Sequence, residues 1–167
     1  MAQLKEQIKQ LVGAEELDQA QMLLQQAISQ LPEDYDLQIE LARVLLQKSQ
    51  AQDAKAVLDN LPETEKGRPD VQGLRAGLKF AEKAPSADEL AALGDRDDSE
   101  ARYLKALAAL VQADYDKAVD LLMAIIRDDR SYDDGSAHKT LLEVFALLGE
   151  GNPLVIQTRR KLFTLMY

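Results

Sequence analysis

Hydrophobic residues recur along this chain at the spacing of amphipathic helices. Leu4, Ile8 and Leu11 lie three and four residues apart, and the same spacing continues from Leu17 to Leu31. Glycine and proline fall mostly between such segments. Ala, Leu, Gln, Glu and Lys dominate, aromatic residues make up only 5%, and runs of β-branched residues are missing. The pattern therefore predicts an all-α chain.

Breaker residues set the limits of the predicted helices. Pro32 and Pro62 each stop a helix, Pro69 suits the first turn of another, and Ser86 with Glu89 three residues later has the pattern of a capping box. The polar segment GDRDDSEAR, residues 94–102, is the strongest breaker, and it divides a front domain, residues 1–94, from a back domain, residues 95–167. We expect helices over about residues 4–12, 17–31, 34–47, 51–60, 69–82, 98–112, 115–128, 135–148 and 153–166, with a short one from Ser86.

Three segments share one packing pattern. In each, a polar turn is followed by alanine, by leucine four residues later, and by a small or apolar residue three further on. A small alanine lets paired helices approach closely, and larger residues fill the groove beside it. The predicted packing residues are Ala20, Leu24, Ala27, Ala54, Leu58, Ala118 and Leu122.

The spacing of this pattern indicates a repeat. Ala20 and Ala54 are 34 residues apart, which is the period of a tetratricopeptide repeat, although the Trp, Gly and Tyr of the strict consensus are missing. We therefore expect an array of antiparallel helical hairpins, with about three tetratricopeptide-like repeats and a fourth, degenerate pair. The methionines Met22, Met123 and Met166 are interpreted as core filler rather than as a client-binding surface.

The net charge of −9 argues against nucleic acid as a partner, because phosphates repel carboxylates. The charge is unevenly distributed. Residues 138–167 hold four Lys or Arg and two Asp or Glu, a net of +2, which leaves −11 for the first 137 residues. No apolar stretch approaches the ~20 residues of a membrane span, and the N-terminus does not resemble a signal peptide. We expect a soluble, cytoplasmic protein that binds no membrane.

Candidate sites for catalysis or metal binding fail on inspection. The chain has no cysteine and a single histidine, His138, without a nucleophile or metal partner in the pattern. If Gly135 took position six of a calcium loop, Arg130 would take position one. That position needs an oxygen ligand, which arginine cannot supply, so the segment does not fit a calcium loop. The carboxylates at Asp97/Asp98 and Asp133/Asp134 are interpreted as helix caps. We expect no catalytic residue, no metal and no cofactor, and hence no enzyme.

The last predicted helix has more apolar surface than one packing face uses. At about 100° per residue, its apolar residues spread over about 220°, with Leu154, Leu162 and Leu165 at one edge and Ile156, Phe163 and Tyr167 at the other. Either both edges are buried, or the second edge docks another protein. Docking would use Ile156, Arg159, Arg160, Phe163 and Tyr167, because aromatic residues beside arginines are common hot spots.

The segment from Ala113 to Tyr167 resembles the C-terminal end of the chaperedoxins, bacterial thioredoxin-like proteins with a helical tetratricopeptide-like region. The matching features are DDG at Asp133–Gly135 followed by Lys139 and Thr140, LLG at Leu147–Gly149, and RRKLFTLMY at Arg159–Tyr167. The chain lacks the family's thioredoxin domain, so it carries no redox function and is expected to be the helical region of a longer protein.

The resemblance implies a protein-interaction module in protein folding. It would hold unfolded clients or dock to the chaperonin machinery, and its own missing thioredoxin domain would be a further partner. Some tetratricopeptide domains clamp a partner's C-terminal carboxylate with Lys, Asn and Arg. Here Lys5 and Lys9 suit that role, but Glu40 and Glu100 occupy comparable places, so we expect no such clamp. The alternative function is a passive helical scaffold or an oligomerisation module with no client.

Overall fold

The structure is a computed structural model that describes residues 2–167, and all regular structure in that range is helical. The all-α prediction is confirmed. A one-turn helix and a 3₁₀ turn were not predicted. In order, the elements are α1 (Ala2–Gly13), α2 (Leu17–Gln30), α3 (Tyr35–Gln47), α4 (Ala51–Asp59), α5 (Glu63–Lys66), α6 (Pro69–Lys83), α7 (Ala87–Leu93), α8 (Ser99–Val111), α9 (Tyr115–Asp128), η1 (Tyr132–Gly135), α10 (Ser136–Leu148) and α11 (Pro153–Met166).

Contacts divide the chain into two compact units, residues 1–74 and residues 75–167, so the boundary falls within α6. The predicted division between residues 1–94 and 95–167 concerns the repeat organisation and stays a prediction.

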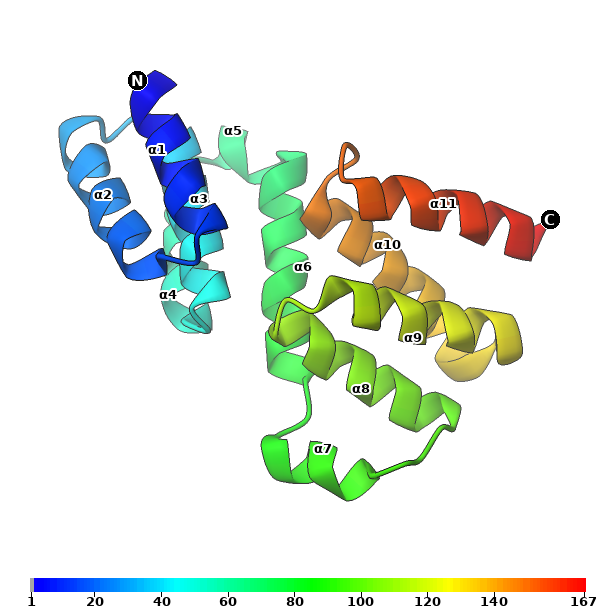
Figure 1. The fold of residues 1–167 in the computed structure, drawn as a ribbon. Helices are drawn as coiled ribbons and strands as arrows, with labels where there is room; N and C mark the ends of the chain where they lie inside the picture. The colour runs from blue at the N-terminus through cyan, green and yellow to red at the C-terminus, as the bar shows by residue number, and fades with distance from the viewer. Residues whose placement is uncertain (1) are drawn as a thin grey trace. The chain divides into compact units, whose positions relative to one another are not determined.

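The first unit is built from helices that are neighbours in sequence. α1 contacts α2, α2 contacts α3, and α3 contacts α4, with the short connections that antiparallel hairpins need (Figure 1). Each helix turns one apolar face inward, so the core gathers side chains such as Ile8, Leu24, Val44 and Leu58, all buried. The two hairpins thus bury their apolar faces on each other, as stacked repeats do.

The second unit continues the same design. α8 pairs with α9, α10 lies against α9, and α11 also contacts α9 (Figure 1). Its core is one cluster in which Leu107, Leu122, Leu141 and Phe145 are almost fully buried. Tyr103 adds a polar tie, because its hydroxyl lies 2.9 Å from the hydroxyl of the buried Thr140. α11 is therefore held on the outside of a well-packed set of helices.

Three hairpins turn in the same way. Glu15, Ser49 and Ala113 occupy the left-handed region, with φ of 60°, 62° and 59°, although none is glycine. In each turn the next backbone N–H donates to a carbonyl five residues before it, as in Glu16 to Leu11 at 2.9 Å. These bonds satisfy carbonyls that the end of the first helix leaves free.

The turns recur in the same register as the predicted packing alanines. Each left-handed residue lies five positions before Ala20, Ala54 or Ala118. The repeat pattern predicted from side-chain size is thus matched by the backbone.

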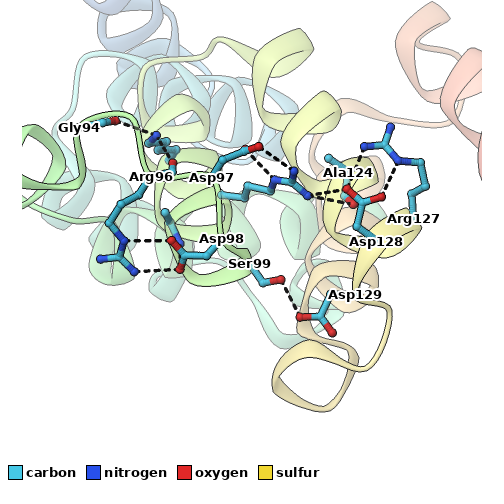
Figure 2. Close-up of polar contacts among 12 residues, drawn as sticks. Gly94, Arg96, Asp97, Asp98, Ser99, Ala124, Arg127, Asp128 and Asp129 are labelled. Carbon is cyan, nitrogen blue, oxygen red and sulfur yellow. Dashed lines mark hydrogen bonds and ion pairs between the residues drawn. The ribbon is translucent and has the colours of Figure 1, made fainter.

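The breaker segment, residues 94–102, is ordered by ion pairs rather than by apolar packing. Figure 2 shows Arg96 bridging to Asp98, and Arg127 to Asp128. Arg102 joins the segment to α9, because its guanidinium contacts Asp97 at 2.9 Å and Asp128 at 2.8 Å. Hydrogen bonds from Arg127 and Arg102 hold the pKa of the Asp128 carboxyl well below its usual range. The segment therefore links α8 and α9 on their polar side.

The structure corrects part of the capping prediction. Asp98 is the N-cap of α8 and accepts a bond from the Ala101 N–H at 3.4 Å, and Ser86 accepts from the Glu89 N–H as predicted. Asp133 and Asp134 do not cap a helix. They lie in η1 with φ of 46° and 56°, and Gly135 is the N-cap of α10. Short carboxylate residues tolerate the left-handed region better than most, which explains their use in this turn.

Candidate protein-binding surface

The C-terminal helix α11 is fixed by local bonds at its start and by apolar contacts along one face. Asn152 is the N-cap, and its side-chain oxygen accepts from the Leu154 N–H at 2.9 Å, while Pro153 stands in the first turn. Val155, Thr158 and Leu162 are buried against the second unit. One face of α11 is therefore used for packing, and the helix is held in a defined rotation.

The opposite face carries an exposed apolar edge, which we define as Ile156, Phe163 and Tyr167. Their exposed fractions are 41%, 67% and 91%. The Phe163 and Tyr167 rings contact each other in a tilted arrangement, with centroids 5.1 Å apart and an angle of 35° between their planes. The sequence left open whether both apolar edges of this helix are buried. In the structure, the edge formed by Ile156, Phe163 and Tyr167 is exposed. A cluster of large apolar side chains on a surface is typical of an interaction site.

The two arginines proposed for docking have different surroundings. The guanidinium of Arg159 lies 4.7 Å from the centre of the Phe145 ring and donates to the Glu150 carboxylate at 2.7 Å. The side chain of Arg160 is exposed and forms no ion pair among the described residues. Arg159 therefore also positions α11 on the core, whereas Arg160 is available to a partner. No local pattern predicts the contacts of Arg159, because Phe145 lies fourteen residues away on another helix.

The predicted packing residues all lie inside the units. Ala20, Leu24, Ala54, Leu58, Ala118 and Leu122 are at most 1% exposed, and Ala27 is 6% exposed. Their role in close helix approach stays a prediction that a substitution can test.

A second candidate surface is a hollow in the first unit of about 360 Å³ lined by residues of α1, α2 and α3. Its apolar wall includes Ile8 and Leu24. Lys5 pairs with Asp36 at 3.4 Å, and Arg43 pairs with Glu40 at 2.7 Å. Two of the three cations that line the hollow are thus neutralised by neighbouring carboxylates. The hollow has little net charge with which to hold a carboxylate.

The remaining sequence candidates lead to no chemical site. His138 is half-buried in the first turn of α10. Within residues 2–167, no group of three His, Cys, Asp or Glu side chains is arranged to hold a metal ion. The interpretation of Met22 as core filler is wrong, since its side chain is 69% exposed on α2. The buried residues of α2 are Ala20, Leu24 and Ala27, and they form one face of the helix. Met22 lies outside that face.

Two descriptions of the tetratricopeptide repeat match the sequence, one over residues 11–78 and the other over residues 80–167. The second alone covers slightly more than half of the chain. The chain belongs to the tetratricopeptide repeat family. The alanine register and the shared turns of this tetratricopeptide repeat protein agree with that assignment. Repeats of this family generally mediate protein–protein interaction, and proteins built from them are typically non-enzymatic interaction modules.

The chain is similar to the crystal structure of a domain of protein VP0806, of unknown function, from Vibrio parahaemolyticus, with 25% identity, full coverage of both chains and a TM-score of 0.46. No curated protein matches the chain. Among residues 2–167, every helix is too short or too polar to span a bilayer.

Proposed function

We propose that this tetratricopeptide repeat protein acts in cytoplasmic protein folding and docks to the chaperonin machinery through the apolar edge of α11. The observation that carries the proposal is the exposure of Ile156, Phe163 and Tyr167 on a helix whose other face is fixed in the core. The resemblance of residues 113–167 to the chaperedoxins supports the choice of partner. Holding unfolded clients for the chaperonin is the activity that such docking would serve.

The charge distribution supports an acidic partner surface. Residues 138–167 carry a net charge of +2, while the rest of the chain carries −11. An acidic partner would be attracted to this end and repelled elsewhere, so that electrostatics would orient the encounter. The arginine beside the apolar edge, Arg160, is the side chain best placed to meet a partner carboxylate. An apolar centre bordered by cations is a common composition for a hot spot.

The test is a charge reversal on α11 with a matched control. We expect Arg160→Glu to fold like the wild type, with stability within about 0.5 kcal/mol, because the side chain is exposed. Its binding to purified chaperonin, measured by biolayer interferometry at low salt, should weaken about fivefold or more. Lys161→Glu makes the same change of charge on the neighbouring position, about 100° away around the helix, and should bind almost as the wild type does.

The outcomes distinguish an Arg160 that contacts the chaperonin from an Arg160 that is only exposed to solvent. Wild-type affinity should fall as salt rises, because salt screens exposed charges. Equal binding by the wild type and both variants would remove the support that Arg160 gives to docking. Loss of binding in both variants to the same degree would show that net charge alone is recognised. A wild-type chain that does not bind chaperonin at all would leave the scaffold or oligomerisation role, which sedimentation of the chain by itself would reveal.

A further inference from the structure

The apolar edge has the spacing of a helix-packing seam. Ile156, Phe163 and Tyr167 are separated by seven and four residues. At about 100° per residue, the three side chains fall within about 40° around α11. The edge is therefore one straight line along the helix, and at about 1.5 Å per residue it is about 16 Å long. A second helix lying along α11 would contact all three residues at once, as neighbouring helices do within a repeat array.

Cations border this line on both sides. Around the helix, Arg160 follows Tyr167 by about 20°, and Arg159 precedes Phe163 by about 40°. Charged residues that flank an apolar seam select the partner in paired helices, because they meet the flanking residues of the other helix. Arg159 is already paired with Glu150. Arg160 remains to meet an acidic side chain of the partner.

We propose that the edge receives an amphipathic α-helix of the partner protein, with acidic residues beside its apolar stripe. This inference rests on the proposed docking function, and it specifies the element that docks. The partner helix would lie along α11 with its apolar residues on Ile156, Phe163 and Tyr167. At least one of its carboxylates would pair with Arg160. The contact would then extend the array by one helix supplied by another chain.

Other occupants fit the edge less well. A second copy would bring α11 against α11, and the sequence of this helix, PLVIQTRRKLFTLM, has three cations and no carboxylate. The pairing would be repulsive. An extended client segment is commonly held by main-chain hydrogen bonds to a sheet edge. The part of the chain that the structure describes contains no strand, and the backbone groups in the middle of α11 are paired inside the helix.

The test uses three fluorescent peptides of about 18 residues, roughly 27 Å when helical. The first has leucines at a helical seam spacing, flanked by glutamates, and is locked as a helix by side-chain cross-links. The second replaces the glutamates by lysines. The third keeps the composition of the first but contains two central prolines, which prevent a helix. Fluorescence anisotropy with the whole 167-residue chain gives the three affinities, and Lys161→Glu serves as the control protein.

We expect the acidic helix to bind the wild type at least about fivefold more tightly than it binds Arg160→Glu, with the lysine peptide showing the reverse preference. The proline peptide should bind at least about tenfold more weakly than the acidic helix, because it cannot present the seam in one line. Equal binding by the acidic helix and the proline peptide would overturn the helical partner. The proposal of a helical partner would also be overturned if sedimentation showed that the wild type self-associates and that Phe163→Ala is a monomer. That result would identify a second copy of the chain as the occupant.

The chaperonin measurement keeps this inference distinct from the proposed function. Chaperonin binding without binding of the acidic helix would refute the helical partner and leave the docking function intact. Binding of the acidic helix without chaperonin binding would refute the chaperonin as the partner. It would support another protein that carries an acidic amphipathic helix. Failure of both would refute both.

Discussion

At the scale of single residues, the most informative positions are the left-handed turns between paired helices. Glu15, Ser49 and Ala113 adopt positive φ although each has a side chain. The left-handed conformation costs an ordinary residue about 1–2 kcal/mol. The turn bonds and the packing of both helices hold these residues in place. Part of the stability of each repeat is therefore used to impose this turn.

Relieving one of these turns should stabilise the protein. We predict that Ala113→Gly raises the free energy of unfolding by about 0.5–1 kcal/mol, because the relieved strain exceeds the entropy that glycine adds to the unfolded chain. The melting temperature should rise by a few degrees at most. Calorimetry would measure both quantities. Ala146→Gly is the control, since Ala146 is exposed inside α10, and it should lose about 1 kcal/mol. A destabilised Ala113→Gly would contradict the strain argument.

At the scale of helices, we expect the alanine positions to limit how closely the two helices of a pair can approach. Ala54 is 1% exposed, in α4 of the second hairpin, whose other helix is α3. A methyl group fills the space there, and protein cores leave few voids larger than a water molecule. We therefore expect the pairing of α3 with α4 to depend on the small size of this residue.

Enlarging this residue should separate the pair. We predict that Ala54→Leu lowers the free energy of unfolding by about 1–3 kcal/mol through overpacking. Ala56 is exposed on the same helix, so Ala56→Leu should change stability by no more than about 0.5 kcal/mol. Urea unfolding curves would give both values. Equal stability of the two variants would mean that Ala54 is not a close-packing position between α3 and α4.

The two phenylalanines near the proposed docking surface should behave in opposite ways. Phe163 is 67% exposed, so Phe163→Ala should leave the free energy of unfolding within about 0.5 kcal/mol while weakening chaperonin binding. Phe145 is 1% exposed and lies under Arg159, so Phe145→Ala should cost about 3–5 kcal/mol. Thermal melts and binding measured on the same samples test both statements. A large stability loss in Phe163→Ala would show that the edge supports the fold.

At the scale of the whole molecule, ion pairs set the response to acid. The chain has 29 Asp and Glu against 20 Lys and Arg. Asp128 meets both Arg127 and Arg102 at 2.8 Å. Hydrogen bonds from Arg127 and Arg102 hold its pKa well below the ordinary value of 3.8. As the pH falls, the Asp128 carboxyl is therefore protonated in the unfolded state before it is protonated in the folded state. The stabilisation that its ion pairs give to the folded state is present above about pH 4 and is lost as the pH falls.

Removing this carboxylate should make the protein less sensitive to acid. We predict that Asp128→Asn melts at a lower temperature than the wild type at pH 7, and that the gap narrows progressively as the pH falls below about 4. The difference should be small, because the side chains of Asp128 and Arg127 are exposed to solvent. Asp120→Asn is the control, since Asp120 is exposed on the same helix and forms no ion pair among the described residues. A gap that stayed constant across the pH series would show that the Asp128 pairs contribute nothing to acid stability.

The sequence by itself determined the helices and their repeat. Helix periodicity and breakers are local properties, and they located every helix longer than one turn. They did not reveal η1, because its left-handed aspartates have no distinct local pattern. Spacing also showed that Ala20 and Ala54 occupy equivalent positions. The cause is that a 34-residue repeat must place the same residue size at the same helix contact.

Only the tertiary structure decided what the last helix presents. Periodicity showed that α11 has two apolar edges, but both edges satisfy the same pattern. The difference is made by distant residues: packing buries Val155 and Leu162, while Phe145 and Glu150 engage Arg159. Ile156, Phe163 and Tyr167 are left exposed by that rotation. Exposure depends on which neighbours a helix meets, and this is a property of the assembled fold rather than of any segment read alone.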